Sequence, residues 1–293
     1  MSEKFIYKNL GVSEGYTRIR LNFSERYNFL TPEKKLLSEE SFLNAGDFSE
    51  GFASVQRLDN RWYFLKTDGT IIPSNGFEYA YKFHNGFAKV VIENRGWNFL
   101  KKDGKLLTKT YYIDARDFED GVAWVKTDDY RWHILKEDGT LISIEGEIKE
   151  INDFSEGFAN VSTEWYKWTY INTDGKFISK ERYWKAHKFT NGFGVVGSDK
   201  HECNFITPNG NLLCDEWYFN ATSFNEGVCW VERADRKCNF VKSDGTRLSE
   251  KWFDEATEFD DGFAMVILDN KYNYLKLDGT MLLEKWRDAP LPS

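Results

Sequence analysis

The sequence contains few of the residues that build disulfide, metal or membrane chemistry. Its 293 residues include only 4 Cys, 4 His, 3 Met and 5 Pro. The cysteines all lie between residues 203 and 238 and form no Cys-x-x-Cys pair, so neither a disulfide framework nor a zinc site is indicated. No apolar stretch approaches the roughly 18 residues of a membrane span, and the first residues, MSEKFIYKNLG, lack the apolar core of a signal peptide. We therefore expect a cytoplasmic protein with free thiols and no membrane contact.

Clusters of basic residues are also absent. The chain carries 39 Lys and Arg against 47 Asp and Glu, which gives a formal net charge of −8 at pH 7, and the two signs are interspersed. An acidic surface repels phosphate groups, so nucleic acid is not an expected partner.

The sequence shows no arrangement of residues that is typical of catalysis. It has no P-loop, dinucleotide-binding glycine pattern, G-x-S-x-G or H-E-x-x-H motif. The four histidines fall at unrelated places: His84, His133, His187 and His201. A Cys–His pair is the catalytic alternative that the sequence leaves open. We expect no enzyme, no cofactor and no metal site.

What the sequence does contain is one pattern repeated eight times. A box such as EGFA carries a glycine that recurs every 35 or 36 residues. These glycines are Gly15, Gly51, Gly86, Gly121, Gly157, Gly192, Gly227 and Gly262. Self-similarity at a fixed period is the signature of a repeat architecture. We predict a single repeat domain, 1–293, with a C-terminal tail at 287–293. Its eight modules cover about 6–41, 42–76, 77–111, 112–147, 148–182, 183–217, 218–252 and 253–286.

Each box predicts a tight turn followed by a strand. Glu, Asp or Asn precedes every glycine of the series, and these residues favour or tolerate tight turns. Two residues after the glycine the side chain is small, as at Ala88, and four residues after it is Val or Ile, as at Val90. A spacing of two places both on one face of a strand. The small residues indicate close approach of neighbouring backbones, as near the axis of a ring.

A second strand follows, and most copies open it with an aromatic residue. The tryptophans at this position are Trp62, Trp97, Trp132 and Trp168. Cys203 and Cys238 replace them in modules 6 and 7. The Asp-Gly or Asn-Gly that ends this strand predicts a hairpin turn in which both residues have positive φ. An aromatic-x-x-Ala-x-x-Phe box then opens the next module and predicts a bent strand or a single turn.

Modules of this size depend on their neighbours. An isolated hairpin is marginally stable in water, whereas stacked copies cover each other's apolar faces. Burying one Trp removes about 150–250 Å² from water, worth roughly 4–6 kcal/mol. We therefore predict an all-β fold of eight tandem hairpin or meander repeats, with the four repeated Trp as structural residues. The small residues favour a closed, propeller-like toroid over an open β-solenoid. Weak copies of the aromatic box, from Ile6 to Asn9 and from Trp286 to Ala289, could complete such a ring.

The combination of F-x-E-G-F-A-x-V, a Trp-led second strand and D-G-x-x-L/I resembles the bacterial WG-repeat (KWG) family. Residues 46–76 and 81–111 carry the resemblance most clearly. The glycine that follows Trp in that family is replaced here, for instance by Asn98 after Trp97. The resemblance implies a β-rich repeat scaffold, usually without assigned chemistry.

Tryptophans outside the shared positions are the candidates for recognition, because the repeat does not fix them and Trp is enriched at binding surfaces. They are Trp124, Trp165, Trp184, Trp217, Trp230 and Trp252. We predict a non-catalytic scaffold that binds another protein. The alternative is a carbohydrate or small-ligand binding module that uses exposed aromatic faces.

Overall fold

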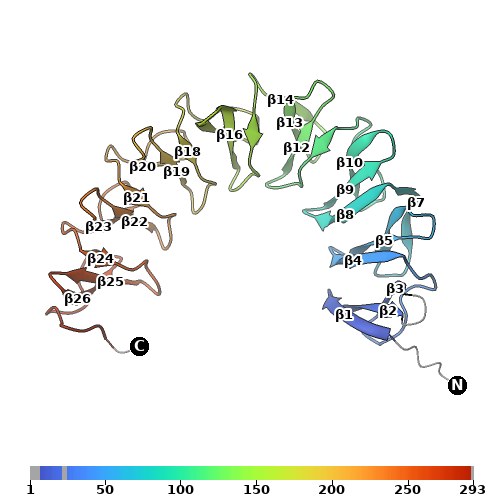
Figure 1. The fold of residues 1–293 in the computed structure, drawn as a ribbon, viewed down its shortest axis with the longest axis horizontal. Coiled ribbons are helices and arrows are strands. Elements are labelled where there is room, and N and C mark those ends of the chain that lie inside the picture. The colour runs from blue at the N-terminus through green and yellow to red at the C-terminus, as the bar shows by residue number, and fades with distance from the viewer. Residues whose placement is uncertain (1–6, 22–24, 292–293) are drawn as a thin grey trace. The chain divides into compact units, whose positions relative to one another are not determined.

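The protein is all-β, as the sequence predicts. A computed structural model describes residues 7–21 and 25–291, and its regular elements are all β-strands. Among these residues no helix has the length and apolar character needed to cross a membrane. The chain divides into two compact units, Met1–Ile144 and Glu145–Ser293, and each holds four of the predicted modules (Figure 1).

The first unit contains four small antiparallel sheets, one in each module. Their strand orders are β1-β2-β3, β4-β5-β6-β7, β8-β9-β10 and β11-β12-β13-β14. The strands are β1 Tyr7–Ser13, β2 Tyr16–Leu21, β3 Tyr27–Leu30, β4 Asn44–Ser49, β5 Phe52–Gln56, β6 Trp62–Lys66, β7 Ile71–Phe77, β8 Tyr79–His84, β9 Phe87–Ile92, β10 Gly96–Lys101, β11 Asp114–Ala115, β12 Val122–Lys126, β13 Trp132–Lys136 and β14 Leu141–Ser143.

The second unit repeats this arrangement with three strands in each sheet. The orders are β15-β16-β17, β18-β19-β20, β21-β22-β23 and β24-β25-β26. The strands are β15 Glu150–Ile151, β16 Phe158–Glu164, β17 Lys167–Asn172, β18 Lys185–Ala186, β19 Gly194–Gly197, β20 Cys203–Ile206, β21 Asn220–Ala221, β22 Val228–Glu232, β23 Cys238–Lys242, β24 Glu255–Ala256, β25 Phe263–Leu268 and β26 Lys271–Lys276.

The aromatic box forms the first strand of its sheet. In β4 and β8 it is a bent strand, because a bulge shifts the register between Ala80 and Phe83 and at the matching place in β4. The bent strand predicted from the sequence is thus confirmed in modules 2 and 3. In modules 4 to 8 only two residues of the box pair as a strand.

The two kinds of turn differ in a way that the sequence does not indicate. At the box glycine both turn residues have positive φ, as in Glu50 (54°) and Gly51 (86°). At Asp68-Gly69 only the glycine does (83°), and the Gly69 N–H donates to the carbonyl of Lys66 at 3.0 Å. The prediction that both residues of the Asp-Gly turns have positive φ is therefore wrong. These turns are three-residue loops that end in a left-handed glycine.

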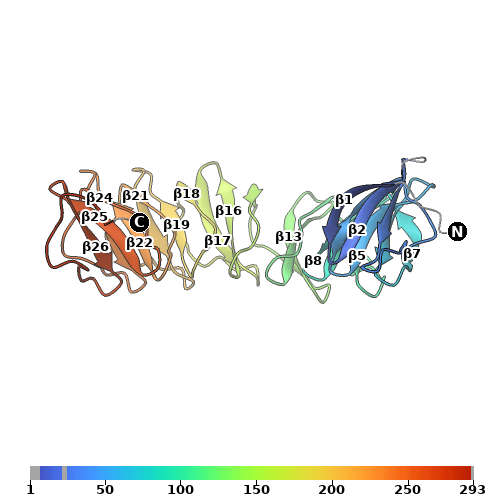
Figure 2. The same cartoon turned by 90° about the horizontal axis from the view of Figure 1, so that it is seen from below.

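Consecutive sheets in a unit follow one another in chain order (Figure 1, Figure 2). A phenylalanine fills each seam between them. We call it the wedge phenylalanine; it is the last residue of the aromatic box, three residues before the turn glycine. The wedges of the six seams inside the units are Phe48, Phe83, Phe118, Phe189, Phe224 and Phe259, and all are buried. The ring of Phe83 lies 4.3 Å from that of Phe52 and 5.0 Å from that of Phe64, both in the preceding module. Phe118 repeats this contact with Phe87 and Phe99 at 4.2 and 4.8 Å.

The small residue two places after the turn glycine makes room for the preceding module. Ala88 is fully buried in the same cluster as Phe64. At the matching position of module 6, a Cβ added to Gly194 would lie 2.7 Å from Cζ of Tyr170 in module 5. The small side chains are therefore explained by the seams, without a ring axis.

Three of the repeated tryptophans, Trp62, Trp97 and Trp168, lie at the edges of these seams. Trp62 is buried, and Trp97, Trp132 and Trp168 are half-buried. The ring of Trp62 lies 5.3 Å from that of Tyr79 in module 3. The backbone of Trp97 exchanges hydrogen bonds of 2.7 and 3.0 Å with Tyr112 of module 4. Trp62 and Trp97 therefore contact the next module, but the wedge phenylalanine occupies the centre of the seam.

A carboxylate clasps one turn to the next along the same edge of the stack. Glu14 accepts hydrogen bonds from the backbone N–H groups of Glu50 and Gly51 at 2.6 and 2.9 Å. Glu50 accepts in turn from Gly86 at 2.9 Å, and Lys102 lies 2.9 Å from its carboxylate. Glu156 and Glu226 make the equivalent clasps in the second unit. The residue before the turn glycine thus serves both its own turn and the next.

A buried asparagine fixes the connection between modules. The side-chain N–H groups of Asn98 donate to the carbonyls of Thr108 and Thr110 at 3.0 and 2.9 Å, and its Oδ1 accepts from the Phe99 N–H at 2.7 Å. The same set of contacts recurs at Asn28, Asn204 and Asn239. Here Asn replaces glycine after the Trp position, and it satisfies carbonyls that burial would otherwise leave unpaired.

Replacing a wedge phenylalanine should destabilise the protein strongly. For Phe83→Ala we expect a loss of about 3–5 kcal/mol in the free energy of unfolding, because a buried ring is removed and a cavity is left. Leu58→Ala, at an exposed position, should change it by less than about 0.5 kcal/mol. Denaturant unfolding followed by circular dichroism measures both. Equal effects of the two variants would contradict the role of the wedge.

The Glu50 clasp should make stability depend on pH. Partial burial would raise the pKa of Glu50, but Lys102 and the N–H groups of Gly86 and Asn85 outweigh it, and the pKa lies below its usual 4.5. The clasp therefore stabilises the fold above about pH 4.5 and is lost as the pH falls through the lower, folded-state pKa. Glu50→Gln should cost about 0.5–1 kcal/mol at pH 7 and nothing at pH 3. Glu39→Gln, which changes an exposed carboxylate, is the matched control and should show no such difference between pH values.

Candidate functional site: an aromatic surface at the hairpin tips

The second and third strands of each sheet are joined by a hairpin turn, and the tip of this turn contains a residue with positive φ. In modules 2, 3 and 8 this residue is asparagine, which tolerates the conformation. In modules 4 to 7 it is bulky. The four residues and their φ values are Tyr130 (65°), Tyr166 (58°), His201 (62°) and Arg236 (66°). A left-handed conformation costs such residues roughly 1–2 kcal/mol, so these side chains are held at the tips against a backbone preference.

In the second unit two of these tips meet an aromatic ring. The ring of Trp184 lies 6.4 Å from that of Tyr166, nearly parallel to it, and 4.6 Å from that of His201, at right angles. Trp165 is 76% exposed and Tyr166 is 65% exposed. We call Trp165, Tyr166, Trp184 and His201 the tip surface. Rings that are gathered in this way yet open to solvent are a feature of recognition surfaces.

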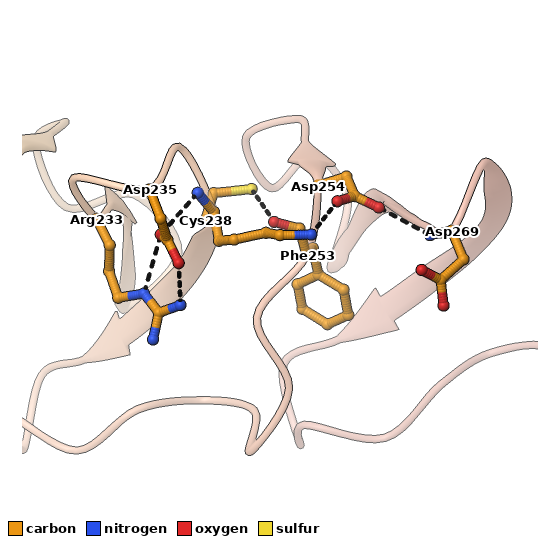
Figure 3. Close-up of polar contacts among 7 residues, drawn as sticks. Arg233, Asp235, Cys238, Phe253, Asp254 and Asp269 are labelled. Carbon is orange, nitrogen blue, oxygen red and sulfur yellow. Dashed lines mark hydrogen bonds and ion pairs between the residues drawn. The ribbon is translucent and has the colours of Figure 1, made fainter.

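Trp184 occupies a position that bridges neighbouring tips in other modules as well. It directly follows the aromatic residue that opens its module, and the equivalent residues are Phe219 and Asp254. The guanidinium of Arg236 lies 4.6 Å from the ring centre of Phe219. Asp254 accepts hydrogen bonds from Nζ of Lys237 and, at 2.7 Å, from the backbone N–H of Asp269 (Figure 3). The tip edge is therefore aromatic in modules 5 and 6, becomes mixed in module 7 and is ionic at the junction with module 8.

Electrostatics accounts for the ionic end of this edge. The Lys237 ammonium and the Asp269 N–H lower the pKa of Asp254, and Asp254 in turn raises the pKa of Lys237. Beside this pair, Arg233 makes an ion pair with Asp235 at 2.5 Å (Figure 3). These charges satisfy one another, so the aromatic end is the part of the edge that remains open to a partner.

The structure separates the six candidate tryptophans into two groups. Trp165 and Trp184 both belong to the tip surface. Trp124, three residues after its turn glycine, is only 1% exposed, so its assignment to a recognition surface is wrong. Trp230 holds the same position in module 7 and packs in the seam with module 8.

The remaining two candidates lie beside the seams. Trp217 is half-buried against the cluster around Tyr183 and Phe189. Trp252 is half-buried, with the guanidinium of Arg233 4.3 Å from its ring centre. Neither is part of the tip surface. Trp217 packs against a neighbouring core cluster, and Trp252 makes a cation–π contact with Arg233.

Sequence reasoning missed Tyr166 and His201, because it considered only tryptophan. A signal was present. Asparagine stands at the tip in modules 2, 3 and 8, and a bulky residue at an asparagine position of a tight turn is unusual. Comparing the tip position across modules would have selected both residues.

A second group of rings lies in the first unit. Trp62, Tyr79, Tyr81 and Trp97 form a row with successive ring centres 5.3, 4.9 and 5.7 Å apart. Tyr79 and Tyr81 are exposed, and Nζ of Lys89 lies 4.8 Å from the ring centre of Tyr81. The repeated tryptophans thus end a partly exposed aromatic row in modules 2 and 3.

The cysteines lie in surroundings that suppress their reactivity. Cys203, Cys229 and Cys238 are buried, and Cys214 is half-buried. Burial raises the pKa of all four thiols, to about 11 for Cys238. A nucleophilic cysteine needs a lowered pKa, so these thiols are protonated at neutral pH. In the described part of the chain no three His, Cys, Asp or Glu side chains gather in a way that could hold a metal ion.

The stacked sheets, the wedge seams and the hairpin tips define a tandem β-sheet repeat protein. Three segments, 97–130, 168–199 and 251–272, match the family model described as the WG containing repeat. The resemblance to the WG repeat seen in the sequence is thus confirmed in these three segments.

Other comparisons add little. No curated protein matches the sequence. Among solved structures, the chain is similar to BamB from Moraxella catarrhalis, with 10% identity over 94% of this chain and 98% of that one and a TM-score of 0.33. It is also similar to Kluyveromyces lactis Hsv2, with 9% identity over 94% and 96% and a TM-score of 0.37. A computationally designed protein, Ika8, gives 11% identity over 84% and 86% and a TM-score of 0.36. At these scores none of the three defines how the modules are arranged.

Proposed function

We propose that this chain is a non-catalytic scaffold that binds another protein through the tip surface. The observation that carries the proposal is the pair Trp165 and Tyr166, which are largely exposed at a tip where Tyr166 takes a positive φ of 58°. Side chains that are costly to place and pack against little of their own chain are suited to contacts with a partner.

The chemistry of the tip surface fits a protein partner. Trp and Tyr provide large contact areas with few rotatable bonds, so little conformational entropy is lost on binding. The ring of Trp184 packs against the rings of both Tyr166 and His201. The seams hold the adjacent sheets, so the rings are presented on a supported edge.

Removing the exposed rings should abolish binding and leave the fold intact. The double variant Trp165→Ser/Tyr166→Ser changes only exposed side chains, so its unfolding should match that of the original chain. In affinity purification under native conditions from the organism that encodes the chain, we expect a stoichiometric partner with the original protein and its loss with the double variant.

Leu58→Ser, at an exposed tip residue of the first unit, is the matched control and should retain the partner. Repeated recovery of no stoichiometric partner, or of the same partner with the double variant, would contradict the proposal.

The aromatic row in modules 2 and 3 supports a second candidate, a carbohydrate-binding function. Exposed rings with little polar cover stack on the apolar faces of sugars, and Tyr79 and Tyr81 are two such neighbouring rings. A glycan array should then show a ligand whose binding falls at least about tenfold in Tyr79→Ala/Tyr81→Ala, a loss of 1.4 kcal/mol or more. An array without any binder would remove this candidate.

The closed, propeller-like ring that the sequence favours stays a prediction. In such a ring the last module would pack on the first module of the same chain. The small residues that suggested it are explained by the seams inside each unit. A cytoplasmic location likewise stays a prediction.

A further inference from the structure

The last module of the chain presents a face that an interior module would have covered. In an interior seam, the wedge phenylalanine packs on the aromatic residue that follows the preceding turn glycine, as Phe83 packs on Phe52. Phe263 holds that position in module 8 and is 40% exposed, whereas Phe52 is buried. Arg287 bridges to Tyr272 just as Phe253 bridges to Cys238 one module earlier. The face of module 8 therefore has the features of an interior face, including the bridge that connects a module to the first residue of the next one.

The first module carries the matching half of a seam. In β1 and β2, Val12 lies opposite Thr17 in the register in which Phe48 lies opposite Ala53, and the bulge is at the same place. Val12 therefore stands at the wedge position, and it is 65% exposed. Ile19 on this sheet is already buried, so the uncovered part is the end beside the turn. Of the predicted box copy at the N-terminus, Ile6 lies outside the described residues.

The clasp is also present in two halves. In an interior seam, the carboxylate before the turn glycine accepts from two N–H groups of the next turn, as Glu14 does from Glu50 and Gly51. Asp261 offers this carboxylate in module 8 and is exposed. The turn of module 1, at Glu14 and Gly15, is exposed as well and has the backbone conformation of the turns that donate.

We infer that module 8 of one copy of this chain binds module 1 of a second copy, head to tail, in the manner of an interior seam. Phe263 covers Val12, and Asp261 accepts hydrogen bonds from the backbone of Glu14 and Gly15. Val12 and Phe263 are both exposed, and the two faces are the complementary halves of one seam, which points to a second copy of this chain as the occupant. Each bound copy leaves one face open at either end of the assembly, so growth continues with concentration. This inference is independent of the proposed function.

Sedimentation velocity of the full chain over a range of concentrations tests the contact. The original chain should form species heavier than the monomer that grow with concentration. Val12→Glu and Phe263→Glu each place a charge in the contact, and each should raise the dissociation constant by at least about tenfold. Tyr130→Glu, an equally exposed change away from both faces, should associate like the original chain.

Mixing the two face variants gives the most specific readout. Val12→Glu keeps an intact module 8 face, and Phe263→Glu keeps an intact module 1 face, so the mixture should form one-to-one dimers that do not grow further. Circular dichroism should show that both variants are folded. A chain that is monomeric at every concentration overturns the inference, as does a mixture that forms no dimer. If the original chain is a monomer whose sedimentation coefficient falls in Val12→Glu, the two faces bind each other within one chain. That result would also overturn the inference.

Discussion

The structure depends on the burial of one phenylalanine in every seam inside the units. A three-stranded sheet of this size cannot bury the apolar side chains on its own faces, so it needs a neighbour to pack against. The wedge ring solves this locally, because it inserts between the two aromatic strands of the preceding module, at 4.3 and 5.0 Å in the case of Phe83. A small residue such as Ala88 beside it provides the space. Stability is then a sum over neighbouring modules.

The remaining regularities of the sequence follow from this contact. The carboxylate of Glu50 accepts from the backbone of the next turn, and the buried amide of Asn98 donates to the backbone of the connection between modules. Together they hold successive modules in one register. The tips lie at the far end of the hairpins from the glycine turns, and their side chains vary widely, from Asn60 to Tyr166 and Arg236. Packing therefore constrains the residue type least at the tips, so these positions can vary to suit a binding partner.

Local chemistry explains which features could be predicted from the sequence. The box glycine and the acidic or amide residue before it encode a turn by themselves, so the strands beside Gly51 or Gly86 were predictable. The choice of ring at the seam centre was not, because Trp97 and Phe118 recur with the same period and both suit a buried position. The Asp-Gly turns were predicted with the wrong conformation, because the type of turn depends on loop length as well as on the residue pair.

The tip surface was only half predictable for a different reason. Trp165 and Trp184 could be singled out as departures from the repeat. That Trp184 meets both Tyr166 and His201, residues 35 apart in the chain, follows only from the stacking of modules 5 and 6. Long-range juxtaposition of this kind requires the seam geometry.

Native-state hydrogen exchange of a wedge variant tests most directly whether each module is held by its neighbour. Phe189 belongs to module 6 and packs on Phe158 and Tyr170 of module 5. If the seam is the unit of stability, Phe189→Ala lowers the protection of β17 in module 5 as well as that of β19 in module 6. Loss of protection confined to module 6 would show that modules fold on their own and would contradict the account.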